Sequence, residues 1–384
     1  MIDKTSSKLE ETVSKTGVHA ATQIMSLNDP QMSRQRFIVF VTKGLEHVSE
    51  KEIRTRFTEA AILDSSTKHI IFSVDSISPQ RLLELKTVDD VHFLVEYFRD
   101  MENINEDFIV ENLPVDAFDD AREFIRKLRK INDTFSITVS KYKNDSVNLE
   151  SLKAKIARRI ADHTNRIHTP LDHSNFDIRI HVESSNVLFS CRVPKISLYV
   201  RAYRKCEKAG SLKPPIAAAL CMLIDPKKGE KVVDNFCGTG TILCEAKLQE
   251  LEPYGGDIDE ESVTCAQTNM GSISLQTNQN IRVLNAGSTK WPDKYFDYAI
   301  SNYPWGKQVP LKRAVELYSK SISEYARILK DDGSIVLLGT KPELIGKHLR
   351  KNFPHHVVTQ FRIGFLGQTP WVSCARPPDS KTDV

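Results

Sequence analysis

The sequence predicts an α/β protein in which a doubly wound, mostly parallel sheet follows a smaller α+β part. Three observations indicate this fold class. The chain has 384 residues, too many for one ordinary hydrophobic core and suited to two or three domains. From residue 214 onward, strand-like and helix-like patterns alternate, which is typical of a parallel sheet covered by helices on both faces. A glycine-containing loop follows the first strand of this region and opens a helix.

The spacing of apolar residues predicts each element in turn. In the N-terminal part we expect strands at 37–41, 135–140, 176–182, 186–191 and 197–204, and helices at 44–57, within 82–98, at 121–131 and at 149–162. In the C-terminal part we expect strands at 231–235, 254–257, 281–284, 298–301 and 334–339, and helices at 214–224, 239–249, 260–270 and 311–329. Residues 1–33 are polar and lack periodicity, which predicts a flexible tail.

Composition restricts the class of protein and its location. Hydrophobic residues are 40% and charged residues 27% of the chain, as in globular proteins. The longest apolar stretch, 214–224, is too short to cross a bilayer, and residues 1–33 fit neither a secretory signal nor a transit peptide. The seven cysteines form no CxxC motif, and His163, His168, His173 and His181 match no common zinc spacing. We therefore expect a cytoplasmic protein in a reducing compartment, without a metal.

Charge is distributed unevenly along the chain. Residues 121–210 contain 19 Lys and Arg against 9 Asp and Glu, a net charge of +10. Residues 31–120 contain 10 against 18, a net charge of −8. A basic excess that persists over several elements predicts a surface for a polyanion, although helix faces exposed only to solvent are the simpler alternative.

The loop after the strand at 231–235 is the first chemical signal. Asp234 ends the strand, Gly238 and Gly240 form a Gly-x-Gly turn, and Asp257 ends the next strand 23 positions later. Such a loop lets a ligand approach the backbone, and a second carboxylate can bind a ribose. A dinucleotide site would have a third glycine where Leu243 stands. We therefore favour S-adenosylmethionine over a nicotinamide cofactor, while a plain tight turn would explain the glycines alone.

The loop after the strand at 298–301 is the second signal. It reads Asn302, Tyr303, Pro304, Trp305 and lies at the same sheet edge as the glycine loop. An exocyclic base amine is a poor nucleophile, and the Asn302 side-chain oxygen together with the Tyr303 carbonyl can accept its protons. Pro304 favours an extended Tyr303, and Trp305 offers a face on which a flipped base stacks. Taken alone, the loop is better explained as an ordinary Pro-Trp-Gly turn with a core tryptophan.

The two loops together resemble those of the amino-methyltransferases of nucleic acids, in the runs 234–241 and 302–307. The stretch 197–214, with Arg201, Arg204 and the sequence Ala-Gly-Ser-Leu-Lys-Pro at 209–214, resembles the lead-in of the THUMP-domain RNA guanine-N2 methyltransferases. This resemblance implies a seven-stranded Rossmann-like class I methyltransferase that methylates N2 of a tRNA guanosine. It implies these parts: a tail at 1–33, a ferredoxin-like module at 34–115, a THUMP module at 116–200, the methyltransferase domain at 201–376 and a tail at 377–384.

The resemblance and the charge pattern together name the candidate residues. The cofactor site comprises Asp234, Phe236, Cys237, Gly238, Thr239, Gly240, Thr241, Asp257, Ile258, Asn285 and Ala286. The base site comprises Asn302, Tyr303, Pro304 and Trp305. The RNA contacts are Lys153, Lys155, Arg158, Arg159, Arg201 and Arg204. We further expect Asp259 to cap the helix at 260–270 and Glu245 to face inward.

Two departures from the family leave alternatives open. Many relatives have a second proline where Tyr303 stands, and the strand-end Asp that often faces adenine is Asn285 here. An rRNA guanine-N2 or DNA adenine methylase could use the same loop, and a catalytically inactive THUMP adaptor would share the RNA-binding half. The expected partner is tRNA, with no membrane, and the protein is expected to be a monomer unless it needs a small activating subunit. The catalytic half, 205–384, is expected to bind the cofactor by itself.

Overall fold

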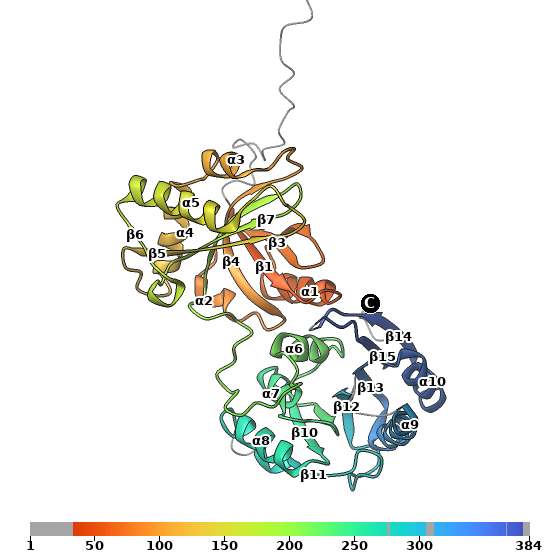
Figure 1. Cartoon of the computed structure of the whole chain (residues 1–384). Coiled ribbons are helices and arrows are strands. Elements are labelled where there is room, and N and C mark those ends of the chain that lie inside the picture. The colour runs from red at the N-terminus through yellow and green to blue at the C-terminus, as the bar shows by residue number, and fades with distance from the viewer. Residues whose placement is uncertain (1–33, 275–276, 305–310, 366, 379–384) are drawn as a thin grey trace, which may run out of the picture. The chain divides into compact units, whose positions relative to one another are not determined.

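The computed structural model describes residues 34–378, except 275–276, 305–310 and 366. The predicted tail at 1–33 and most of the one at 377–384 thus lie outside the described residues. The chain forms two compact units (Figure 1). The smaller unit contains residues 94–120 and 132–190, and the larger unit contains residues 34–93, 121–131 and 191–378. No helix within the described residues is long and apolar enough to cross a membrane.

The larger unit is built on a seven-stranded sheet with the order β11-β10-β9-β12-β13-β15-β14. Its strands are β9 (Lys231–Asp234), β10 (Glu252–Asp257), β11 (Ile281–Val283), β12 (Phe296–Asn302), β13 (Leu329–Gly339), β14 (Val357–Arg362) and β15 (Trp371–Arg376). The first five run parallel, and β15 is antiparallel to both of its neighbours. The predicted doubly wound sheet is therefore confirmed, including its number of strands.

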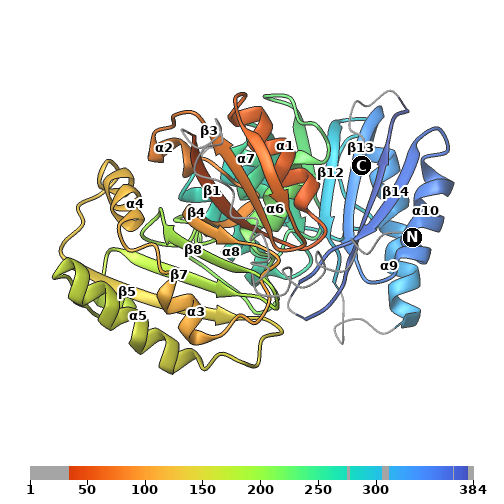
Figure 2. The same ribbon diagram turned by 90° about the horizontal axis from the view of Figure 1, so that it is seen from above.

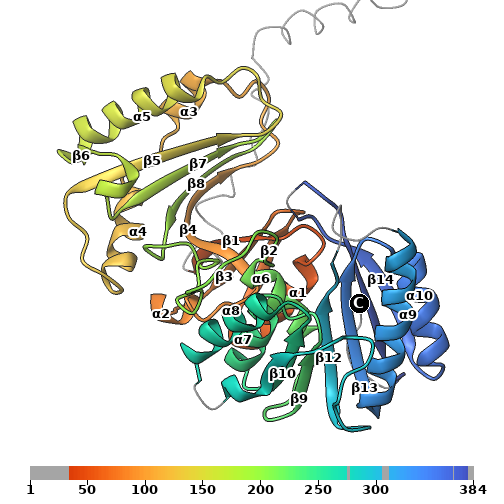
Figure 3. The same cartoon turned by 60° about the horizontal axis from the view of Figure 1, so that its bottom comes forward.

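Both faces of this sheet are covered, because successive apolar residues of its inner strand β9 face opposite sides. The helices are α6 (Pro214–Met222), α7 (Thr241–Leu248), α8 (Glu260–Gly271), α9 (Leu311–Ile328) and α10 (Pro342–Asn352), with a short 3-10 turn at Thr277–Asn280. Val232 packs into one core with α6, and its neighbour Val233 packs into a second core with α9 and α10. Figure 3 shows α9 and α10 together on one side of the strands.

The N-terminal part of the larger unit contains β1 (Gln35–Val41), α1 (Glu46–Arg56), β2 (Ala61–Ser65), β3 (His69–Val74), α2 (Pro79–Leu82) and the first half of β4 (Val88–Phe98). The helix predicted within 82–98 is wrong, because most of this range is β4. Val88 and Val91 have helical spacing, but both pair with β1, opposite Val41 and Val39. Pairing with a distant strand therefore overrides the local pattern.

The predicted strand at 197–204 is also wrong, because these residues form turns. One backbone bond ties this stretch to β4, from the Tyr199 amide to the Asp89 carbonyl (3.0 Å). Side-chain bonds hold the rest: the Ser197 hydroxyl donates to Asp90 (2.6 Å) and Arg201 pairs with Glu245 (2.9 Å). The other predicted helices and strands of the catalytic half agree with the structure within a few residues.

The smaller unit contains the second half of β4, α3 (Glu106–Glu111), the start of α4 (Ala117–Arg126), β5 (Thr134–Lys141), α5 (Leu149–Thr164), β6 (Ile167–His168), a 3-10 turn at Leu171–His173, β7 (Asp177–Val182) and most of β8 (Val187–Arg192). Its strand order is β4-β8-β7-β5-β6. Asn148 caps α5 by accepting the amides of Glu150 and Ser151, and α5 packs along β5 (Figure 2).

The compact units divide the chain at other positions than the predicted modules, whose boundaries stay a prediction. Residues 34–93 share a hydrophobic core with the catalytic sheet, since Leu45 and Val48 pack in one cluster with Ile216 of α6. Gly44 has a φ of +90°, and a Cβ there would lie 2.1 Å from the Arg362 carbonyl oxygen. Only glycine allows this close approach of two backbones.

Candidate active site

A cavity of about 770 Å³ lies at the carboxyl edge of β9, β10 and β12. The glycine loop, the end of β10 and the Asn302 loop all line it, although they are separated by up to about seventy positions in the chain. The cavity is lined by sixteen residues from four parts of the chain, namely 208–212, 234–242, 257–259 and 262. Asn302, Tyr303 and Pro304 are among its other lining residues. The structure therefore brings together the two loops that the sequence singled out.

The two glycines of the first loop have different roles. Gly238 lines the cavity at φ +49°, and a Cβ there would meet nothing within 4 Å. Its amide donates to Asp257 Oδ2 at 2.9 Å. Gly240, at φ +77°, is not among the lining residues, and a Cβ there would lie 3.0 Å from that of Ala266 on α8. Gly238 thus leaves room for a ligand, whereas Gly240 permits helix packing.

Asp234 lies at the base of the cavity and is 1% exposed. Its Oδ1 accepts the Ser301 hydroxyl and the Phe236 amide, the latter at 3.0 Å. Burial and, to a smaller extent, the negative charge of Asp257 raise the pKa of Asp234 to about 7, although the two hydrogen bonds act in the opposite direction. This carboxyl therefore titrates near neutrality, far above an ordinary aspartate.

Two further carboxylates follow at the end of β10. Asp257 accepts backbone amides on both oxygens, from Gly238 and from Asp259 (3.1 Å), so its orientation is fixed. Asp259 caps α8 as predicted, accepting the Ser262 amide at 3.2 Å. Bonds from Lys208 and Ser262 lower the pKa of Asp259 to about 2. The predicted Ile258 is 74% exposed at the cavity wall.

The Asn302 loop presents polar backbone and side-chain groups to the cavity. β12 ends at Asn302, and Pro304 also lines the wall. The Tyr303 ring is fully buried, 4.7 Å from the Phe236 ring and 4.6 Å from the Tyr318 ring between centroids. Its hydroxyl bonds that of Ser321 at 2.8 Å. These contacts of the Tyr303 side chain hold the backbone of the same residue in place. The predicted Trp305 lies outside the described residues.

Of the remaining predicted cofactor residues, four line the cavity and two do not. Phe236, Cys237, Thr239 and Thr241 line the cavity. Burial raises the pKa of the Cys237 thiol, which agrees with packing and not with a nucleophile. Asn285 and Ala286 do not line the cavity, and the exposed Asn285 accepts the Gly287 amide at 3.0 Å.

The position of Arg201 argues against a role as an RNA contact. Its side chain is only 10% exposed and pairs with Glu245, which is fully buried as predicted. It also donates to the carbonyls of Lys86 (2.7 Å) and Leu198. Arg204 is 15% exposed and pairs with Glu207 at 3.1 Å. The ion pair of Arg201 is therefore structural, because it holds the lead-in segment against α7.

Two walls of the cavity contain none of the candidate site residues named from the sequence. Residues 208–212 of the lead-in form one, and Phe365 and Gln368 from the β14–β15 connection form the other. Asn269 of α8, 1% exposed, fixes the first wall: its Oδ1 accepts the amides of Lys205 (2.8 Å) and Cys206 (2.9 Å). Its Nδ2 donates to the carbonyls of Cys206 (2.8 Å) and Thr239 (2.9 Å). The sequence signal that could have indicated this role is a polar residue on the buried face of the predicted helix at 260–270.

The cysteines and histidines were expected to form no metal or redox motif. The structure joins Cys206 of the lead-in to Cys265 of α8 as a disulfide, which differs from the expectation of cysteines in a reducing compartment. No group of three or more His, Cys, Asp or Glu in the described part of the chain is arranged to hold a metal ion. His163 pairs with Asp116 at 2.7 Å, and His181 contacts Ser140 at 2.5 Å.

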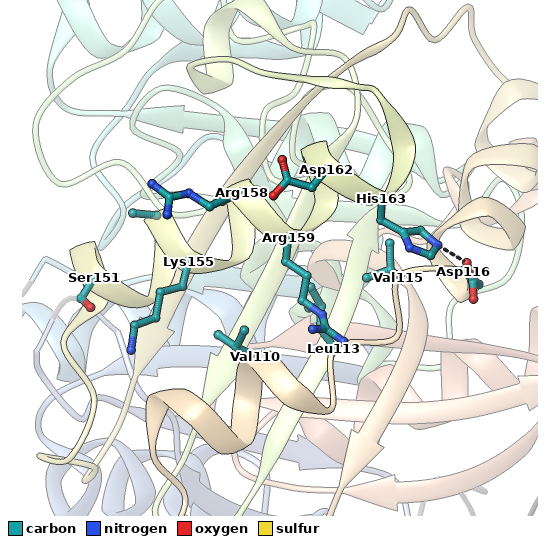
Figure 4. A pocket seen from close by; sticks show the side chains of 11 residues that line it. Val110, Leu113, Val115, Asp116, Ser151, Lys155, Arg158, Arg159, Asp162 and His163 are labelled. Carbon is teal, nitrogen blue, oxygen red and sulfur yellow. Dashed lines mark hydrogen bonds and ion pairs between the residues drawn. The ribbon is translucent and has the colours of Figure 1, made fainter.

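Three of the four predicted RNA contacts on α5, Lys155, Arg158 and Arg159, line a second cavity, of about 870 Å³, in the smaller unit (Figure 4). Lys155 pairs with Glu106 (2.9 Å) and Asp107 (3.2 Å) of α3. Arg158 and Arg159 are exposed, and the Arg159 guanidinium reaches the Glu111 carbonyl at 3.5 Å. Carboxylates thus partly neutralise this basic helix, and the RNA role of Lys153, Arg158 and Arg159 stays a prediction.

The parallel sheet with an antiparallel last pair, a glycine loop after β9 and a polar loop after β12 define a class I methyltransferase fold. TrmN from Thermus thermophilus has this fold, with a TM-score of 0.72 at 18% identity over 89% of this chain and 99% of that one. SMU.472, a putative methyltransferase, gives a TM-score of 0.68 at 15% identity over 91% of this chain and 99% of that one.

Sequence comparison narrows the class to a family. The family described as "RMKL-like, methyltransferase domain" matches residues 201–369. A probable tRNA (guanine(10)-N2)-dimethyltransferase of Methanothermococcus thermolithotrophicus is 30% identical over 132 residues, which are 33% of this chain and 80% of that protein. The U6 snRNA (guanine-N(2))-methyltransferase THUMPD2 of Bos taurus is 29% identical over 170 residues, 44% of this chain. The chain belongs to the THUMP family of S-adenosylmethionine-dependent RNA guanine-N2 methyltransferases. It spans about a third of the length of bovine THUMPD2 (33%).

Proposed function

We propose that this protein transfers a methyl group from S-adenosylmethionine to the exocyclic N2 of a guanosine in tRNA. The observation that carries the proposal is one cavity lined by both the glycine loop with its two carboxylates and the Asn302 loop. The archaeal relative is named for guanine-N2 methylation of tRNA. We propose a cytoplasmic enzyme that acts as a monomer or with one small activating subunit.

The residues of the cavity fit S-adenosylmethionine. Gly238 leaves open space where a side chain would stand, so a ligand can approach the loop backbone. Asp257, with its orientation fixed by two amides, suits the ribose hydroxyls, and the buried Asp234 suits the positively charged methionine end. Residues 208–212 and Gln368 would close the remaining sides. When bound, the cofactor supplies an electrophilic methyl group.

The Asn302 loop would prepare the base amine. The amine lone pair is delocalised into the guanine ring, so N2 needs acceptors that draw its protons out of the ring plane. We assign this role to the Asn302 side-chain oxygen and the Tyr303 carbonyl, because both residues line this wall. The Tyr303 ring, packed between Phe236 and Tyr318, keeps that carbonyl in place. Preorganised acceptors of this kind stabilise the positive charge that develops on nitrogen.

The test is methyl transfer in vitro with unmodified tRNA, rRNA, U6 snRNA and duplex DNA, followed by mass spectrometry of the nucleosides. U6 snRNA is included because the bovine relative is named for it. We expect N2-methylguanosine or its dimethylated form in tRNA. Asn302→Ala should lower the single-turnover rate by about 10²–10³ while cofactor affinity is kept. Methyladenine as the product, or a wild-type rate in the Asn302 variant, would contradict the assignment.

A further inference from the structure

In the folded protein, the positive charge of residues 121–210 is divided between the two compact units. Of the net +10 in residues 121–210, residues 132–190 contribute only +1, from 8 Lys and Arg against 7 Asp and Glu. In the smaller unit these residues combine with 94–120, which hold 1 basic and 9 acidic residues. The described part of the smaller unit is therefore acidic, with 9 basic against 16 acidic residues and a net charge of −7.

The rest of the basic excess belongs to the larger unit. Residues 191–210 contain 6 Lys and Arg against 1 Glu, a net charge of +5, and residues 121–131 add +4. A polyanion is attracted to the net field of a surface and not to the charge of a sequence window. The larger unit, which also contains the cavity, is thus the part of the molecule that attracts nucleic acid.

Within the larger unit, residues 193–213 combine cations with exposed apolar side chains. We name this stretch the docking segment. Lys195 and Lys205 are exposed and make no ion pair with any described residue. Between them, Ile196 is 62% exposed, Tyr199 41% and Val200 51%. Unpaired cations that alternate with an exposed aromatic ring are typical of a surface for single-stranded nucleic acid.

The docking segment is held rigidly and leads into the active-site cavity. Its backbone is fixed where the Tyr199 amide donates to the Asp89 carbonyl (3.0 Å) and where Arg201 pairs with the buried Glu245. The Lys213 ammonium lies 5.7 Å from the centre of the Tyr199 ring. The two residues before Lys213 in the chain, Ser211 and Leu212, line the cavity. A strand bound along this surface would therefore lie next to the site of methyl transfer.

We propose that the docking segment is the main RNA-docking surface of this enzyme, with Lys195 and Lys205 on phosphates and an unpaired base stacked on Tyr199. The inference rests on the proposed function for its substrate class, since RNA is the polyanion that such an enzyme binds. In this proposal the RNA contacts of the segment are its exposed residues, and no longer Arg201 and Arg204, which the sequence suggested. It also assigns less of the affinity to α5, whose unit is acidic.

Two charge-reversed double variants of the full chain test the inference. Lys195→Glu with Lys205→Glu alters the docking segment, and Lys153→Glu with Arg158→Glu makes the same charge change on α5. Both are titrated with an unmodified tRNA transcript at two salt concentrations. We expect the first variant to bind at least about tenfold more weakly, with a salt slope smaller by roughly 1.5, because two phosphate contacts are lost. The α5 variant should lose less affinity for tRNA than the docking-segment variant.

Tyr199→Ala tests the stacking contact separately, because it changes no charge. It should weaken binding about fivefold or more and leave the salt slope unchanged. Binding of S-adenosylmethionine and the unfolding temperature serve as controls for the fold in all variants. If the Lys195/Lys205 variant binds tRNA as tightly as the parent at both salts, if the α5 variant loses more, or if the parent binds no RNA, the inference is overturned. Failure of the proposed function gives a different result, in which RNA binding responds as expected but no methylguanosine forms.

Discussion

Asp234 shows how the fold changes the chemistry of a single residue. Its carboxyl is buried beside Ser301, and its pKa is raised to about 7. Because the folded state holds this proton more tightly than the unfolded chain, Asp234 adds stability below about pH 4 that is lost as the pH rises through 7. Asp234→Asn keeps the shape of the side chain but removes the titration.

We therefore expect the parent to lose stability between pH 4 and 7 relative to Asp234→Asn, by roughly 1.4 kcal/mol for each pH unit in that window. Urea unfolding of both proteins without cofactor at pH 5, 6 and 8 measures the difference. Equal pH slopes in the two proteins would mean that Asp234 is already ionised in the folded state at low pH.

At the scale of elements, α8 carries one wall of the cavity through Asn269. Asn269→Asp replaces the Nδ2 amide group, which donates to the carbonyls of Cys206 (2.8 Å) and Thr239 (2.9 Å), by one carboxylate oxygen that cannot donate to either. We expect faster hydrogen exchange at residues 205–206 and at least about tenfold weaker binding of S-adenosylmethionine. The control is Gln267→Ala on the same helix, which removes a bond to the Ile281 carbonyl (2.9 Å) away from the cavity. If both variants weaken cofactor binding equally, Asn269 stabilises the fold in general and has no particular role at this wall.

The turn before α1 supports the opposite wall. Gly44 lies against Arg362, and the Gly364 amide donates to the Lys43 carbonyl at 2.8 Å, next to the cavity-lining Phe365. Gly44→Ala should cost about 1 kcal/mol for the positive φ and more for the contact with Arg362, and it should weaken cofactor binding.

Gly229→Ala provides the matched control for this change. Gly229 has a similar φ of +82°, but a Cβ there meets nothing within 4 Å. Denaturant unfolding of the two variants should therefore show a clearly larger loss at Gly44 than at Gly229. Equal losses would indicate that the backbone at Arg362 moves aside without cost.

At the scale of the whole molecule, the catalytic half is not a separate body. A chain of residues 205–384 would lack Arg201, leaving the buried Glu245 without its cation, and would expose the core that Leu45 and Val48 share with α6. Unpaired buried charges cost several kcal/mol, comparable to the stability of a domain. We expect this fragment to be unfolded or aggregated by circular dichroism and gel filtration, whereas residues 34–384 should bind S-adenosylmethionine. If the fragment binds the cofactor, residues 205–384 fold by themselves, as the sequence analysis expected.

The sequence by itself determined the doubly wound sheet, the glycine loop and the Asn302 loop, because each depends on local periodicity or on residues within one turn. Only the tertiary structure decided the roles of Arg201, Lys155 and Asn285, because burial and ion pairing depend on partners far away in the chain. For the same reason β4 is a strand where local spacing favours a helix. The basic segment of the sequence is divided between two units, one of them acidic, because chain contacts and not sequence windows determine which charges share a surface.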